Sequence, residues 1–193
     1  NAVQKRIRQF RAVTEPEVSI QLARKIARSK ISSQRSFLLR ATRSSPDLRE
    51  QADTSIRTLK RALSQCDAAE DIDSLRGAEG NAGRAYFASF NCLLNPEQQE
   101  HFGFVRRSRR PPEDRINCLL GFGYALLFSA VHAAIRVAGL DPALGVLHQP
   151  RSSAPPLVLD LMEIFRVPLW DIPLVGSINR GQWNPDDDFN IAP

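Results

Sequence analysis

Glu79 is a carboxylate on the apolar stripe of a predicted helix. The apolar positions around it recur in steps of three and four, at Leu75, Ala82, Tyr86, Phe90 and Leu93. A carboxylate on such a stripe is costly to bury unless it is paired, protonated or bound to a metal ion. Glycines at positions 77, 80 and 83 weaken this helix but let a ligand or another backbone approach closely. Glu79 is therefore either a salt-bridged residue at the rim of the stripe or a ligand.

Asp160 and Glu163 are two further carboxylates in an apolar setting. Every other residue from 157 to 165 is apolar, and a spacing of three puts the two carboxylates on one face of a helix. Two carboxylates on one face of a buried helix favour a cation site. Compensation of the helix dipole is the alternative explanation for Asp160, which lies near the first turn.

His148 is the candidate nitrogen ligand, and it lies in a predicted loop. One imidazole with two or three carboxylates is an oxygen-rich donor set, which favours Mn²⁺ or Mg²⁺ over Zn²⁺. His101 and His132 are weaker candidates, because neither lies near a carboxylate pattern. The separations between positions 79, 148 and 163 match no local metal motif, so spacing alone does not assemble these residues into one site.

The elements that must position these residues are helices, and the fold class predicted is mainly α. Periods close to 3.6 residues, prolines at helix starts and caps such as Asp114 and Gly139 mark the ends. The expected helices are 17–43, one that begins at Pro46, 70–94, 115–138, about ten residues from Pro155-Pro156 that Pro168 stops, and a short one capped by Asp171 that runs to about Ile178. Residues 95–113, 140–154 and the tail are expected to be loops.

The segment from Ile116 to Ile135 contains 20 residues without a formal charge, which is the length of a membrane span. It also contains polar residues and glycines, and it lacks an aromatic belt at both ends. We therefore expect a buried central helix, around which the other helices of the domain pack.

The charge of the chain is divided unevenly. Of 26 basic residues 22 are Arg, which favours an anionic partner, although high-GC codon usage gives the same bias. Residues 1–61 carry a net charge of +10 and residues 62–193 a net charge of −5. We expect basic helices over 1–65, a metal-binding catalytic core over 66–180 and an acidic tail over 181–193. Nucleic acid is a plausible partner for the basic region.

The chain has three cysteines, spaced 26 residues apart, and no C-x-x-C motif. A disulfide framework and a thiolate zinc site are both disfavoured. A reducing, cytoplasmic compartment fits this cysteine usage. The absence of an initiator Met indicates a piece of a longer protein.

Four ordered strings give the chain a specific resemblance. They are LRGAEGNAGRAYF (75–87), RRPPEDRINCLLGFGYALL (109–127), GLDPALGVLH (139–148) and LVLDLMEIFR (157–166), and ARKIARSKISSQRSFLLR (23–40) adds a weaker match. Together they resemble the helical C-terminal domain of the CRISPR-associated integrase, the DNA endonuclease of the spacer-acquisition complex. The β domain that precedes it in that family and mediates dimer formation has no counterpart in this sequence.

The resemblance implies a metal site of Glu79, His148 and Glu163, with Asp160 beside it as a fourth catalytic residue. The family often has Asp at the position of Glu163, and Glu keeps the carboxylate. The implied cofactor is Mn²⁺ or Mg²⁺. A neutral His148 ligand would make activity fall at low pH. Tyr86 is expected to pack in the core. Phosphate contacts are expected from Lys30, Arg35, Arg84, Arg106, Arg107, Arg109, Arg110 and Arg151.

The implied reaction is phosphoryl transfer, in which a 3′-hydroxyl of a prespacer duplex attacks a phosphodiester of the CRISPR repeat. The implied partners are double-stranded DNA and a second copy of the chain, with two dimers bridged by a small ferredoxin-like protein. Some family members are fused to an iron–sulfur nuclease that trims prespacers. The alternatives are a transposon-encoded integrase of the same superfamily and a non-catalytic helical DNA-binding scaffold; intact Glu79, His148 and Glu163 argue against the scaffold.

Overall fold

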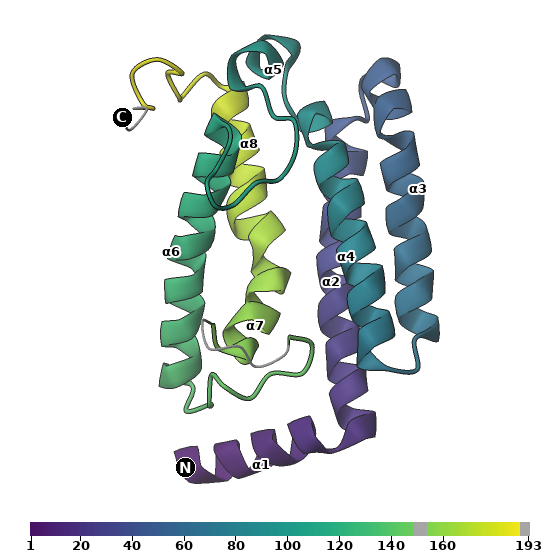
Figure 1. The fold of residues 1–193 in the computed structure, drawn as a ribbon, viewed down its shortest axis with the longest axis vertical. Helices are drawn as coiled ribbons and strands as arrows, with labels where there is room; N and C mark the ends of the chain where they lie inside the picture. The colour runs from purple at the N-terminus through teal and green to yellow at the C-terminus, as the bar shows by residue number, and fades with distance from the viewer. Residues whose placement is uncertain (149–153, 190–193) are drawn as a thin grey trace.

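The computed structural model describes residues 1–148 and 154–189, and its regular elements are helices, as predicted. They are α1 (Ala2–Thr14), α2 (Pro16–Ala41), α3 (Pro46–Ala68), α4 (Ile72–Ala88), η1 (Phe90–Leu93), α5 (Pro96–Phe102), α6 (Arg115–Val137), α7 (Pro156–Arg166), η2 (Val167–Asp171) and α8 (Ile172–Asn179). In Figure 1, α2, α3 and α4 stand side by side, α6 and the α7–α8 segment stand beside them, and α1 crosses one end.

The helix starts follow from side-chain caps and prolines. The Asp71 and Asp114 carboxylates accept hydrogen bonds from the amides of Ser74 and Asn117, each at 2.7 Å, and so satisfy amides that have no partner within the helix. Pro16 separates α1 from α2, because the residue before a proline is held out of the helical region. Both predicted boundaries of α2 are confirmed within two residues, and the predicted start of α3 at Pro46 is confirmed.

The central helix of the fold is α2, and the prediction that residues 115–138 form it is wrong. Helix α2 contacts α3 and α4 on one side and α7 on the other, and buries Ala23, Ala27, Ile31 and Leu38 completely. Helix α6 lies at the outside (Figure 1), and Phe122 and Leu126 on it are 59% and 53% exposed. By length and composition α6 would suffice to cross a membrane, and 28% of its most apolar window is buried.

The contact of α6 with η2 depends on a glycine. A Cβ atom at Gly123 would lie 1.7 Å from the indole ring of Trp170, so the ring occupies the space of a side chain. The same indole donates a hydrogen bond to the carbonyl of Leu119 at 3.1 Å. Gly123 therefore sets the distance between α6 and the α7–α8 segment, which carries part of the candidate site.

Two local predictions are corrected by the structure. Pro168 does not stop the helix; the chain passes through one π-helical turn, η2, and continues as α8. Such a turn accommodates the missing amide by shifting the hydrogen-bond register. The region 95–113, expected to be a loop, contains the short helix α5, which begins at Pro96 and ends at Gly103 with a positive φ of 55°. The N-terminal residues form α1, within the region 1–65 where basic helices were expected. The apolar pattern did not give its bounds, because no residue in it is buried.

Candidate metal centre and the adjoining cleft

The side chains of Glu79 on α4 and Glu163 on α7 face each other across α2, where Lys30 lies between them. The Lys30 Nζ atom contacts the Oε1 atom of Glu79 and lies 2.7 Å from the Oε2 atom of Glu163. Lys30 is 8% exposed. In this structure the ammonium of Lys30 is buried and neutralises the two predicted ligands, so the contact of Lys30 with DNA stays a prediction.

Glu163 is 3% exposed and carries its negative charge in the core. Burial acts to raise its pKa, but the charges of Lys30 and Arg166 outweigh burial, so the pKa of Glu163 lies below its usual range. The Arg166 Nη1 atom donates to Glu163 Oε1 at 2.7 Å. Glu163 is thus ionised at neutral pH, as a metal ligand must be.

Asp160 holds the loop that carries His148, residues 145–148, which we call the histidine loop. Its Oδ2 atom accepts hydrogen bonds from the amides of Val146 and Leu147 at 2.6 and 3.1 Å. Its Oδ1 atom lies 2.9 Å from the His148 amide and 2.8 Å from the His148 Nδ1 atom. A carboxylate has about four lone-pair sites, so these contacts occupy Asp160 fully. The structure gives Asp160 a positioning role, and the catalytic role that the resemblance implies for it stays a prediction.

Gly145 allows this arrangement, because a Cβ atom there would lie 2.6 Å from the Pro156 Cβ atom and 2.8 Å from the Asp160 Oδ2 atom. With Nδ1 bound to a carboxylate, the Nε2 atom of His148 is the free ring nitrogen. It lies 4.0 Å from Glu163 Oε1. The sequence-distant positions 148 and 163 are therefore brought together by the contact between Asp160 and the histidine loop.

The residues present fit a hard divalent cation. In the part of the chain that the structure describes, no three acidic, His or Cys side chains surround a common metal position as the atoms stand. The ammonium of Lys30, however, contacts both Glu79 and Glu163, so the site already accommodates a positive charge. Two carboxylates and one neutral imidazole nitrogen are donors that suit Mn²⁺ or Mg²⁺. The ligand set of Glu79, His148 and Glu163 stays a prediction, which this convergence supports.

A cleft of about 550 Å³ adjoins these residues and is lined by both acidic and basic side chains. Lys30, Glu79 and Glu163 belong to its lining, as do five arginines: Arg84, Arg106, Arg107, Arg109 and Arg166. Such a mixture is typical of a site that holds a cation beside phosphate groups.

The predicted phosphate contacts differ in their surroundings. Arg84 and Arg109 are exposed and line the cleft, and Arg110 is exposed on the same loop. Arg106 is exposed and forms a two-pronged ion pair with Glu113, at 3.0 and 3.1 Å.

Arg107 and Arg35 are half-buried, and Arg151 lies outside the described residues. The Arg107 guanidinium donates to Asn117 Oδ1 at 2.7 Å and lies 5.6 Å from the centre of the Tyr124 ring. Burial lowers its pKa. Arg107 is thus part of the wall of the cleft rather than a free surface cation.

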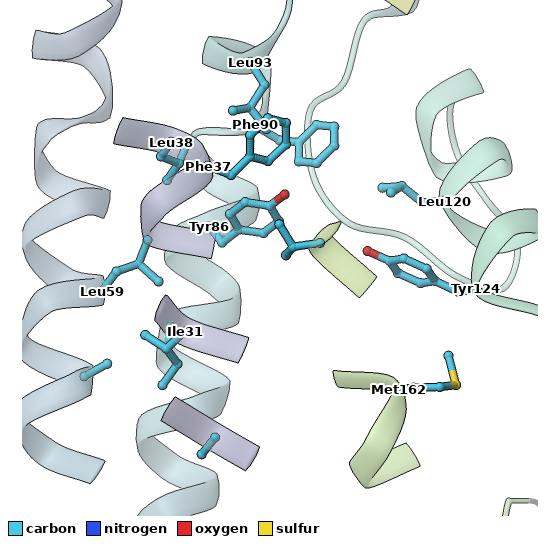
Figure 2. Packing of buried hydrophobic residues seen from close by; sticks show 14 of the residues in the cluster. Ile31, Phe37, Leu38, Leu59, Tyr86, Phe90, Leu93, Leu120, Tyr124 and Met162 are labelled. Carbon is cyan, nitrogen blue, oxygen red and sulfur yellow. The ribbon is translucent and has the colours of Figure 1, made fainter. Parts of the chain in front are cut away.

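A buried aspartate, Asp171, was missed as a functional candidate, since it was predicted to be a helix cap. It caps nothing with its side chain; its carboxylate accepts hydrogen bonds from the hydroxyls of Tyr86 and Tyr124 at 2.9 and 2.8 Å. Figure 2 shows these two tyrosines among the core residues, on opposite sides of the α7–α8 segment. Burial raises the pKa of Asp171 to about 6, although both hydrogen bonds act to lower it. The sequence signals that could have indicated this cluster were an acidic residue, Asp171, and a tyrosine, Tyr124, each within an apolar run.

Arg166 was also missed, although it follows Glu163 by three residues. Its guanidinium contacts Glu163 and lies 4.7 Å from the centre of the Tyr124 ring. The predicted packing role of Tyr86 is confirmed, since its ring is fully buried. The glycines at 77, 80 and 83 admit no other backbone within 4 Å of a Cβ position; Gly80 and Gly83 line the cleft instead.

Comparison with known proteins places these features in a family. The sequence model for "CRISPR associated protein Cas1" matches residues 1–193. A curated relative from Leptospira interrogans (serogroup Icterohaemorrhagiae serovar Lai, strain 56601), named as a CRISPR-associated exonuclease Cas4/endonuclease Cas1 fusion, is 45% identical over 193 residues, which are 100% of this chain and 35% of that protein.

Two solved structures have the same fold over nearly the whole chain. A chain of a Cas6-RT-Cas1–Cas2 complex superposes with a TM-score of 0.82 and 33% identity, covering 95% of this chain and 19% of that one. A Cas1 protein from Thermotoga maritima gives a TM-score of 0.81 and 26% identity, covering 97% of this chain and 56% of that one. The chain thus spans about a third of the length of the curated fusion protein it matches.

Proposed function

The chain belongs to the CRISPR-associated Cas1 family, and we propose that it is the catalytic domain of a metal-dependent DNA endonuclease and integrase. The observation that carries the proposal is the convergence of Glu79, Glu163 and His148 beside an arginine-lined cleft. The proposed reaction inserts a prespacer into a CRISPR array: a 3′-hydroxyl of the prespacer attacks a phosphodiester of the repeat, and a new 3′-hydroxyl leaves.

Glu79, Glu163 and His148 would hold one Mn²⁺ or Mg²⁺. Asp160 and Arg166 would keep His148 and Glu163 in position for it. Such an ion, when bound, activates the attacking hydroxyl and neutralises charge on the phosphate oxygens. The Asp160 carboxylate accepts a hydrogen bond from the Nδ1–H group of His148, which leaves the Nε2 lone pair for the ligand position. Arg166 donates a hydrogen bond to the Glu163 carboxylate at 2.7 Å, which favours the present orientation of that carboxylate.

The arginines of the cleft would hold the DNA backbone. Arg84 on α4 and Arg109 on the loop before α6 are exposed on the wall of the cleft, so their guanidinium groups are free to bind phosphate oxygens in a two-pronged geometry. Phosphate contacts fix the position of the DNA without reading its bases. The repeat sequence is thus not expected to be read by these two residues.

The proposed assembly contains more than one copy of the chain and a bridging protein. Integration needs two strand-transfer events a spacer length apart, and a spacer of about 35 base pairs spans roughly 120 Å at about 3.4 Å per step. A globule of this size has a radius of gyration of only about 16 Å. We propose two homodimers bridged by a small ferredoxin-like partner, in line with the Cas1–Cas2 complex above, and association with a prespacer-trimming iron–sulfur nuclease, in line with the Cas4 fusion.

A strand-transfer assay with matched variants tests the reaction. Glu79→Gln is expected to abolish joining of a prespacer to a repeat-bearing plasmid, by at least about 100-fold, while DNA affinity changes less than about threefold. Glu100→Gln, an exposed glutamate on α5, serves as the matched control with unchanged joining. Wild-type joining by Glu79→Gln would contradict the proposed function.

A further inference from the structure

Lys30 is a buried cation in direct contact with both proposed carboxylate ligands. Its ammonium contacts Glu79 and lies 2.7 Å from the Glu163 Oε2 atom, and its side chain is 11% exposed. An ammonium has three N–H donors; Lys30 donates to Glu79 and forms an ion pair with Glu163, so its charge lies against both groups that would bind a metal. A buried lysine in that position is not explained by packing, since an apolar side chain would fill the same space without desolvating a charge.

We propose that Lys30 is the counter-ion of this site in the metal-free protein, and that a divalent cation binds by displacing its ammonium. The inference rests on the proposed function, because it concerns the same two carboxylates. The ammonium contacts both carboxylates at once, and a metal bound to both must occupy nearly the same space. Metal–carboxylate distances are about 2.0–2.6 Å. An ammonium that kept both of its contacts would be held against a doubly charged ion, which Coulomb repulsion strongly disfavours.

The cleft gives the displaced ammonium somewhere to go. Lys30 itself lines the cleft of about 550 Å³, next to the site. The lysine side chain has a flexible four-carbon stem and a compact charged head, so the head can turn into the cleft while the backbone of α2 stays in place. In the cleft the ammonium becomes available to phosphate oxygens. The exchange therefore moves one positive charge from the carboxylates toward the DNA when the metal arrives.

A purely structural ion pair leads to the opposite expectations. If Lys30 kept its contacts in the metal-bound state and oriented the ligands, its removal would weaken metal binding. If it competes with the metal, its removal strengthens metal binding and destabilises the metal-free protein, because the buried Glu163 and the half-buried Glu79 then lose a counter-ion. The sign of the change in metal affinity separates the two roles.

Lys30→Met tests the proposal, with Lys25→Met, an exposed lysine on the same helix, as the matched control. Free Mn²⁺ is measured by its electron paramagnetic resonance signal during titration of the purified protein, and the melting temperature is measured in EDTA and in saturating Mn²⁺. Lys30→Met is expected to lower the Kd for Mn²⁺ by at least about fivefold. It is also expected to lower the melting temperature in EDTA by about 4 °C or more. The rise in melting temperature on addition of Mn²⁺ is expected to be larger for Lys30→Met than for the wild type.

An unchanged or weaker Mn²⁺ affinity in Lys30→Met overturns the proposal while the metal site itself stands. If the variant does not fold in EDTA, Mn²⁺ is titrated while helical circular dichroism is followed. Recovery of the helical signal means that the metal replaces the ammonium, and a failure to recover overturns the proposal. If the wild type binds no Mn²⁺, the metal-dependent function fails together with the displacement.

Discussion

The Asp171 carboxylate makes the stability of this protein depend on pH in a specific direction. Burial raises its pKa in the folded protein to about 6, whereas an unfolded chain has a value of about 3.9. The folded state therefore binds the Asp171 proton more tightly than the unfolded state does. A raised folded pKa contributes stability below about pH 4, and this contribution is lost as the pH rises to about 6.

The size of the effect follows from the shift. A difference of about two pKa units corresponds to about 3 kcal/mol of unfolding free energy. Asp171→Asn removes the titration and keeps an acceptor for one of the two tyrosine hydroxyls. Relative to this variant, the wild type is expected to be about 2 kcal/mol more stable at pH 4 than it is at pH 7, because the unfolded carboxyl is already half ionised at pH 4. The altered hydrogen bonds also change the free energy of unfolding, but this change is the same at every pH and so does not affect the comparison.

Urea unfolding followed by circular dichroism measures this difference at intervals from pH 4 to pH 8. The other titrating groups contribute equally to both proteins, so they cancel when the variant is subtracted. Tyr124→Phe gives an internal check: it removes a hydrogen bond that lowers the pKa of Asp171, so the fall in stability should extend to higher pH. The reasoning would be refuted if the unfolding free energy of the wild type minus that of Asp171→Asn were constant across this range, or if it increased with pH.

Four further variants test the packing and the cleft. Gly145→Ala is expected to displace the histidine loop, lower stability by about 1–3 kcal/mol and reduce strand transfer, whereas Gly77→Ala, which meets no atom within 4 Å, should leave strand transfer intact. Gly123→Ala places a methyl group inside an indole ring and should lower the melting temperature by several degrees in thermal unfolding. Replacing Arg84 and Arg109 together by Ala should flatten the salt dependence of DNA affinity by up to about 1.8 in slope; an unchanged slope would show that these arginines do not contact phosphates.

The helices and the unusual position of Glu79 could be predicted from the sequence, because each is indicated by residues within a single segment. Pro46 and Asp114 mark helix starts whatever the tertiary structure is, and the apolar stripe around Glu79 is visible in one segment. The pairing of Glu79 with Lys30 is not visible, because the two residues lie 49 positions apart and on different helices. Likewise, only the fold reveals that Asp160 is saturated by the histidine loop.

Helix α6 shows why apolar composition did not predict burial. A helix that is apolar on all sides normally lies in the core, yet Phe122 and Leu126 face outward. Apolar composition indicates that a helix surface tends to be buried, but it does not indicate which other element packs against that surface. In the same way, the run of arginines from 106 to 110 predicts a basic surface, while the structure sets Arg107 apart by stacking it on Tyr124.

The central claim is that Glu79, Glu163 and His148 together bind one divalent ion. Pulsed electron paramagnetic resonance of the Mn²⁺-loaded protein detects nitrogen nuclei bound directly to the metal. The account predicts one Mn²⁺ per chain with the coupling of a single imidazole nitrogen, which disappears in His148→Gln but persists in His101→Gln. A nitrogen coupling that survives in His148→Gln, or Mn²⁺ bound with no nitrogen coupling in the wild type, would contradict it.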